Sequence, residues 1–247
     1  MGCSHCMQES SPEPMHMERG TWLQALSVAR LSRANVLLIS GGEPTSHPQW
    51  MQMLEEACKF PCVALITNGS WLHNDTVVEW MRGMLRKYKN LSVQITSVEG
   101  IYPMYDMVVS GYKSANLPRT SLETGQLNIL ALGRASRNEP YRTMAKSSLG
   151  TTSCFSSALV AAQIPYLQSI QNMELRGKFC HPLIDWQGKM HWSESWKCPS
   201  FADVHDTFVE IQRKACEWRP CLRCQDSDKL RNNNSTQYKV AKLILGI

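Results

Sequence analysis

The sequence lacks any long apolar run. No stretch of its 247 residues approaches the roughly 18–20 uninterrupted apolar residues that a membrane span needs. Residues 1–20 also lack the apolar core of a secretory signal. The sequence therefore argues against a membrane partner, and we expect a cytoplasmic protein.

The chain also lacks a large net charge of either sign. The chain has 26 basic and 21 acidic residues, and the excess of +5 is too small to indicate nucleic-acid binding. A hydrophobic content of 43% with 19% charged residues excludes disordered and fibrous classes. The length predicts one main domain with a short C-terminal module.

Cysteine is too scarce for a disulfide-stapled protein of this length, since the chain has ten. Several lie in Cys-x-x-Cys pairs, which a reducing compartment leaves free to hold metal. The first pair is Cys3 and Cys6, and by itself it fits a structural zinc and an iron–sulfur site equally well. Cysteine usage thus points to metal chemistry.

Over the first hundred residues, segments with the apolar spacing of an amphipathic helix alternate with short apolar runs typical of buried strands. This alternation predicts a parallel α/β sheet. The expected elements are helices over 18–33, 48–58 and 74–88 and strands over 36–39, 63–66 and 91–97. From 100 to 119 we expect a loop-rich insertion around a strand near 107–109, and the next strand over 127–132. Residues 151–170 have no clean period.

Two strand ends carry the most informative residues. The strand over 36–39 leads into Gly41, Gly42 and Glu43, followed by Pro44. Two glycines let a ligand approach the backbone closely, and Glu43 adds a fixed carboxylate beside them. The next strand ends in Thr67-Asn68-Gly69.

In content and order, the Cys-Ser-His-Cys segment, the Gly-Gly-Glu-Pro element and the Thr-Asn-Gly strand end resemble the radical S-adenosylmethionine superfamily over residues 1–135. That family uses Cys-x3-Cys-x2-Cys. Cys3 and Cys6 match its last two cysteines, and the first would lie four places before Cys3, so we expect the chain to be truncated at its N-terminus. The resemblance implies a partial (β/α)6 barrel of the TIM type that lacks its first strand.

The resemblance also implies site roles. Cys3 and Cys6 would ligate a 4Fe-4S cluster, while S-adenosyl-L-methionine would occupy the open iron. Gly41, Gly42 and Glu43 would hold the methionyl amino group, which needs carbonyls and a carboxylate. The remaining candidates are His5 near the adenine, against an equally weighted surface role, and Asn68 and Ser97 toward ribose or substrate, against plain strand capping.

The composition changes beyond Lys178 to tryptophan, cysteine and charge. This segment resembles the SPASM or twitch extensions of peptide-modifying members of the family, which hold auxiliary clusters. The spacings depart from the usual pattern, so one auxiliary iron–sulfur cluster or one zinc is expected. The expected ligands are Cys198, Cys216, Cys221 and Cys224, with Cys180 as a substitute for one of them.

The remaining cysteines, Cys58, Cys62 and Cys154, are expected to pack as small hydrophobes. The predicted domains are a radical S-adenosylmethionine core over 1–177, a cysteine-rich module over 178–230 and a tail over 231–247.

The resemblance implies an enzyme that reductively cleaves S-adenosylmethionine to a 5′-deoxyadenosyl radical. Its electron donor would be a flavodoxin or ferredoxin. A peptide or protein substrate is favoured by the C-terminal resemblance alone. The alternative is an inactive remnant whose cysteine-rich end acts as a zinc- or iron-binding interaction module.

Overall fold

The computed structural model describes residues 15–125, 137–139, 183–191 and 199–217. The chain divides into two compact units. The first unit contains the residues up to Arg19 and those from Ala29 to Ser148, and the second contains Gly20–Val28 together with the chain from Leu149 onward. Each unit is described by itself.

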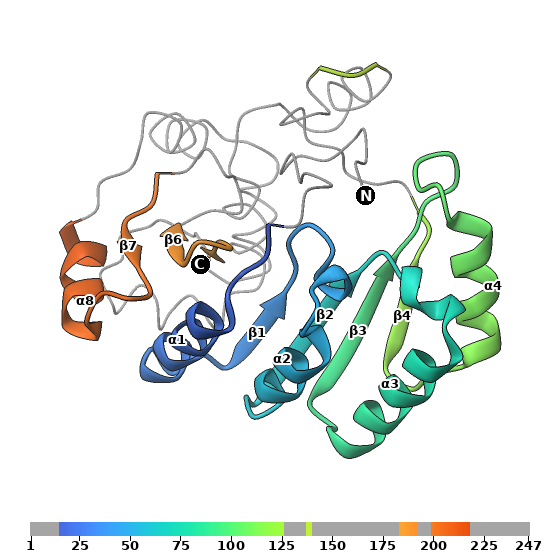
Figure 1. The fold of residues 1–247 in the computed structure, drawn as a ribbon, viewed down its shortest axis with the longest axis horizontal. Coiled ribbons are helices and arrows are strands. Elements are labelled where there is room, and N and C mark those ends of the chain that lie inside the picture. The colour runs from blue at the N-terminus through green and yellow to red at the C-terminus, as the bar shows by residue number, and fades with distance from the viewer. Residues whose placement is uncertain (1–14, 126–136, 140–182, 192–198, 218–247) are drawn as a thin grey trace, which may run out of the picture. The chain divides into compact units, whose positions relative to one another are not determined.

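The first unit is built on a parallel sheet with the strand order β1-β2-β3-β4 (Figure 1). Strands that follow one another along the chain are thus neighbours in the sheet, with β1 and β4 at its edges. Its strands are β1 (Val36–Ile39), β2 (Cys62–Thr67), β3 (Leu91–Thr96) and β4 (Thr120–Glu123). Its helices are η1 (Pro44–Ser46), α2 (Trp50–Ala57), η2 (Ser70–His73), α3 (Asp75–Lys87) and α4 (Tyr105–Ala115).

Burial alternates along the strands of this sheet. On β3, Leu91, Val93 and Ile95 are buried, while Ser92 and Gln94 between them are exposed. The buried residues belong to the face that α3 and α4 help to cover, since Val108 of α4 lies close to Ile95 at Gly69. The alternation shows a sheet with one covered face.

The α/β class and the first elements of the sheet are confirmed. The strands expected over 36–39, 63–66 and 91–97 and the helices expected over 18–33, 48–58 and 74–88 agree with the observed elements to within a few residues at each end. The strongest signals were short apolar runs for strands and the amphipathic pattern for helices.

The expectation for 100–119 is wrong, because residues Tyr105–Ala115 form helix α4 and hold no strand. Val108 and Ala115 are seven positions apart and are both buried, which places them on one helix face. Gly111 lets this face approach η2, where a Cβ atom would lie 3.0 Å from Cβ of Leu72. Strand β4, which the sequence reading did not anticipate, follows α4. The strand expected over 127–132 lies outside the described residues.

The second unit joins an N-terminal helix to C-terminal strands. Residues 20–28 of α1 (Arg19–Leu31) belong to it, together with β5 (Leu183–Ile184), β6 (Lys189–His191), β7 (Ala202–Asp203) and α8 (Phe208–Glu217). Ala25 and Val28 share a core with Met190, Val204 and Ile211. A helix expected to belong to the barrel core therefore also helps to build the C-terminal unit.

Strands β5 and β6 form an antiparallel hairpin whose turn contains Gly188. Asp185 organises this turn, because its Oδ1 accepts hydrogen bonds from the N–H groups of Gln187 and Lys189, each at 2.9 Å. Its Oδ2 lies 3.0 Å from Nε2 of His191. The carboxylate thus fixes both the turn and the following strand.

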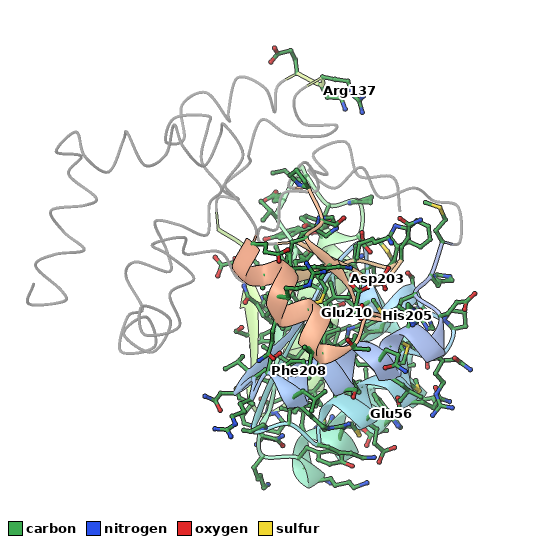
Figure 2. The ribbon with its side chains drawn as sticks, turned by 90° about the vertical axis from the view of Figure 1, so that its left-hand side faces the viewer. Glu56, Arg137, Asp203, His205, Phe208 and Glu210 are labelled. Carbon is green, nitrogen blue, oxygen red and sulfur yellow. The ribbon has the colours of Figure 1, made fainter. Side chains whose placement is uncertain are left out.

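Helix α8 begins with a reciprocal cap. The hydroxyl of Thr207 accepts the N–H of Glu210 at 3.3 Å, and Oε2 of Glu210 accepts the N–H of Thr207 at 2.9 Å. Figure 2 labels Phe208 and Glu210 of this helix. Upstream, burial raises the pKa of Asp203, but the hydrogen bonds from Lys189 and the His205 N–H outweigh it and leave the pKa below its usual value. These contacts hold the loop between β7 and α8.

Within the described part of the chain, no helix has the length and apolar character required to cross a bilayer.

Gly69 gives a sharp test of the first unit. Its φ is +77°, and a Cβ atom there would lie 2.6 Å from Cγ2 of Ile95 and 2.9 Å from Cγ1 of Val108. Gly69→Ala should therefore lower the free energy of unfolding by about 2–4 kcal/mol through backbone strain and overpacking. Urea unfolding followed by tryptophan fluorescence measures the change.

Gly83→Ala is the matched control. Gly83 lies inside α3 on its exposed side, and a Cβ atom there meets nothing within 4 Å. The control should be stabilising by about 0.5–1 kcal/mol, because alanine is the better helix former. Equal effects of the two substitutions would contradict the packing described at Gly69.

Candidate functional site

The polar residues singled out in the sequence meet at one edge of the sheet. Gly41, Gly42 and Glu43 follow β1, Asn68 follows β2, and Ser97 follows β3. The three strands are parallel and in register, so these residues share the edge formed by the carboxyl ends of the strands. Open α/β sheets and barrels both place their ligand sites at this edge.

The carboxylate of Glu43 connects two of the strand ends. Its Oε1 accepts hydrogen bonds from the Thr45 N–H at 3.0 Å and from the hydroxyls of Thr45 and Thr67 at 2.7 Å each. Its Oε2 accepts the N–H of Asn68 at 2.7 Å. The side chain is half-buried, so these bonds tie the loop after β1 to the end of β2.

The end of β2 is ordered by the same bonds. The hydroxyl of Thr67 donates to Glu43 and accepts the N–H of Gly69 at 3.2 Å. The carboxamide oxygen of Asn68 accepts the N–H of Ser70 at 2.8 Å. That oxygen therefore caps the turn into η2, as the capping alternative for Asn68 expected.

The backbone at Gly41 is open to its surroundings. Its φ is +139°, a region that favours glycine, and a Cβ atom built there would meet nothing within 4 Å. Gly41 and Gly42 are both exposed, directly before the half-buried Glu43. The loop therefore presents accessible main chain beside a fixed carboxylate.

Ser97 is the buried polar residue of this edge. Its side chain is fully buried at 0% exposure, and its Oγ has no hydrogen-bond partner in the described part of the chain. Its N–H donates to the carbonyl of Glu123 at the end of β4 at 3.0 Å. A buried hydroxyl without a partner costs free energy that a bound polar ligand can recover.

His47 lies just beyond η1 and engages both of its ring nitrogens. Nε2 lies 2.9 Å from the carbonyl of Met17, and Nδ1 accepts the N–H of Gln49 at 2.9 Å. The ring of His16 meets it edge to face, with centroids 5.0 Å apart. This histidine joins the loop after β1 to the segment that precedes α1.

The predicted metal ligands are mostly beyond the described residues, as is His5. Cys3, Cys6, Cys180, Cys198, Cys221 and Cys224 lie there, as does Cys154. Cys216 belongs to α8. Among the residues that the structure does describe, no three His, Cys, Asp or Glu side chains form a metal-binding group.

The expectation that Cys58 and Cys62 pack as small hydrophobes holds for only one of them. Cys58 is buried at the end of α2, but Cys62 is exposed at the start of β2. Cys62 pairs in register with Val36 of β1, which is also exposed. Cys62 is exposed because it lies on the face of β2 opposite to the buried residues Val63 and Leu65.

No protein-family model matches this chain, and no curated protein matches it.

From the sequence, no site role was assigned to three residues of this edge. They are the hydroxyl donors Thr45 and Thr67 and the histidine His47. Thr45 stands two places after Glu43, the spacing at which a side-chain oxygen can accept a backbone N–H in a tight turn. That spacing was the signal for Thr45. Thr67 and His47 depend on contacts across 24 and 30 residues and gave no local signal.

Replacing Glu43 tests the link between the strand ends. Glu43→Ala removes one acceptor of four hydrogen bonds and leaves the donors of Thr45, Thr67 and Asn68 unpaired. The free energy of unfolding should fall by about 2–3 kcal/mol, in the range for hydrogen bonds to a charged group. Urea unfolding measures this loss.

Glu79→Ala is the control, because Glu79 is an exposed α3 residue whose ion pair with Arg82 lies at the surface. Its effect should stay below about 0.5 kcal/mol. A Glu43 variant as stable as this control would contradict the linking role.

The two described cysteines should differ in reactivity. Burial raises the pKa of Cys58 to about 11, while Cys62 is exposed. At pH 8 only about 0.1% of Cys58 is thiolate, the form that reacts. Iodoacetamide should therefore label Cys62 well before Cys58 in the native chain, as peptide mass spectrometry can show. Urea should abolish the difference, and equal labelling without urea would contradict the burial of Cys58.

Proposed function

We propose that this chain carries the core of a radical S-adenosylmethionine enzyme, with the loop from Gly41 to Glu43 as its cofactor-binding element. The observation that carries the proposal is the arrangement of this loop. An open glycine backbone stands beside a carboxylate that is fixed at the carboxyl edge of a parallel sheet. Among the described residues that resemble the family, those of the Gly-Gly-Glu-Pro and Thr-Asn-Gly elements lie on adjoining strand ends.

The sheet topology supports a partial barrel. Parallel crossovers are right-handed, so a sheet whose strands follow in chain order receives its connecting helices on one face. The order β1-β2-β3-β4 has this property, and burial on β3 alternates accordingly. A barrel uses the covered face for its helices and turns the other face inward. The (β/α)6 barrel remains part of the proposal.

The residues at the edge suit the amino-acid part of the cofactor. Glu43 Oε2 accepts one hydrogen bond, from Asn68, and a carboxylate oxygen can accept a second. The space next to Gly41 admits a group that a side chain would exclude. An ammonium group placed there would meet a carboxylate and main-chain carbonyls, which are the acceptors it needs.

Ser97 suits the sugar end of the same cofactor. It lies two strands away from Glu43 along the edge, and its buried Oγ lacks a partner among the described residues. A ribose hydroxyl can both donate and accept, so it can satisfy this oxygen whichever way the serine hydroxyl points. The Asn68 side chain has a capping role that makes it the weaker candidate.

The chemistry that a bound cluster and cofactor would supply is reductive cleavage of S-adenosylmethionine and hydrogen abstraction from a substrate. Cys3 and Cys6 would hold the cluster, and the strand-end residues would orient the cofactor and exclude water from it. Glu43 has a double task in this scheme, because the carboxylate that faces the cofactor also fixes the loop that carries it. A flavodoxin or ferredoxin as electron donor and a peptide or protein substrate stay part of the proposal.

The C-terminal unit is proposed to hold one auxiliary iron–sulfur cluster or one zinc. Its described residues form their own core around Met190 and Val204. The hairpin at Gly188 lies between Cys180 and Cys198, and α8 carries Cys216. A small unit with its own core can present cysteines independently of the sheet.

The test is production of 5′-deoxyadenosine. The chain should be prepared with a short N-terminal extension that places a cysteine four residues before Cys3, loaded anaerobically with iron and sulfide, and reduced with dithionite beside S-adenosylmethionine. Chromatography should detect 5′-deoxyadenosine. Cys6→Ala should abolish it, because a cluster short of a ligand is not held.

Cys62→Ala is the matched control, since Cys62 is exposed at the opposite end of β2 from Asn68. It should retain the parental yield and iron content. No product from the loaded parent, or equal product from Cys6→Ala, overturns the proposal. Metal bound without product, and lost on replacing Cys221 and Cys224, would instead favour the metal-binding interaction module.

A further inference from the structure

His47 connects two segments that lie far apart in sequence at the proposed cofactor edge. Its Nε2 is 2.9 Å from the carbonyl oxygen of Met17, across 30 residues. A carbonyl can only accept, so Nε2 carries the proton and donates it. The half-buried His16 packs edge to face on the same ring. The segment before α1 is thus attached to the loop after β1.

The second ring nitrogen is also engaged. Nδ1 of His47 accepts the N–H of Gln49 at 2.9 Å, a bond within the loop itself. With Nε2 donating and Nδ1 accepting, the neutral imidazole is held in one tautomer and one orientation. The ring therefore makes one local bond and one long-range bond, which two different substitutions can separate.

His47 lies in the loop that also carries Glu43, so its long-range bond connects this loop to a second part of the chain. Glu43, four residues earlier, joins the same loop to the end of β2. Met17 follows Cys6, the last predicted cluster ligand, by eleven positions. The loop from Gly41 to Gln49 is thereby attached to β2 at one end and to the segment after the cysteines at the other.

We propose that His47 is a positioning residue that holds residues 15–19, the described segment nearest to Cys3 and Cys6 in sequence, against the loop that carries Gly41 and Glu43. The inference rests on the proposed function, since it assigns the bond the task of setting the chain that leads from the cluster cysteines relative to the cofactor loop. His47 acts through the carbonyl of Met17, together with its ring contact to His16 and beside the ion pair of Arg19 with Glu56.

Two substitutions separate the bonds of His47. In His47→Asn, the carboxamide oxygen stands near the place of Nδ1 and can still accept the Gln49 N–H, but the side chain is too short to reach Met17. In His47→Gln, the amide nitrogen stands near the place of Nε2 and can still donate to Met17. Both substitutions lose the ring contact with His16, so they differ from each other only in the hydrogen bonds. His47→Gln keeps the long-range bond and is the conservative rescue, and His47→Asn keeps the local bond.

Limited proteolysis tests the attachment without reference to any cofactor. A glutamate-specific protease should cleave after the exposed Glu18 faster in His47→Asn than in the parent or His47→Gln, because release of the Met17 carbonyl lets this segment enter the protease. Urea unfolding should give the same midpoint for all three proteins, which shows that the sheet remains folded. Equal cleavage after Glu18 in the two variants would overturn the attachment and the proposal with it.

Equilibrium binding of S-adenosylmethionine to the N-terminally extended chain, loaded with iron and sulfide as in the test of the proposed function, tests the positioning role. His47→Asn should weaken binding by about 3- to 10-fold, the range expected for one neutral hydrogen bond. His47→Gln should stay close to the parent, with equal iron content in all three proteins. Equal affinities in the parent and both variants would overturn the positioning role alone. No binding by the loaded parent would overturn the proposed function and the role that rests on it.

Discussion

The hydrogen bonds accepted by the Glu43 carboxylate are the constraint on which the rest of the site depends. A half-buried carboxylate must be compensated, and here four donors from two successive strand ends provide the compensation. Two of these residues also accept hydrogen bonds and so fix the turn that follows β2. The Thr67 hydroxyl accepts the Gly69 N–H, and the Asn68 carboxamide oxygen accepts the Ser70 N–H. One side chain therefore shapes the loop after β1 and the turn after β2 together.

Glycines allow this arrangement at two points for opposite reasons. At Gly69 a side chain is excluded by Ile95 and Val108, so the turn after β2 can lie directly on the sheet and α4. At Gly41 a side chain meets nothing, and the missing Cβ leaves the main chain accessible. The first glycine serves packing and the second serves access. The proposed function draws only on the second.

Helix α1 shows how one element can serve both units. Arg19, its first residue, belongs to the sheet unit, while Ala25 and Val28 belong to the core of the C-terminal unit. The attachment of Met17 by His47 lies just before this helix, on the side of the sheet unit. At Arg19 and Gly20 the chain thus passes from the sheet unit into the C-terminal unit.

The sequence by itself determined the α/β class, the first three strands and the placement of Gly41, Glu43 and Asn68 at strand ends, because apolar runs and glycine turns are local signals. It misjudged Tyr105–Ala115, where adjacent valines favour a strand but contact of Gly111 with η2 favours a helix. Only the tertiary structure decided the bonds from Glu43 to Thr67 and Asn68, the bond from His47 to Met17 and the exposure of Cys62. These features depend on contacts between residues 24 to 30 positions apart and on which face of the sheet is covered, and no local sequence pattern specifies either.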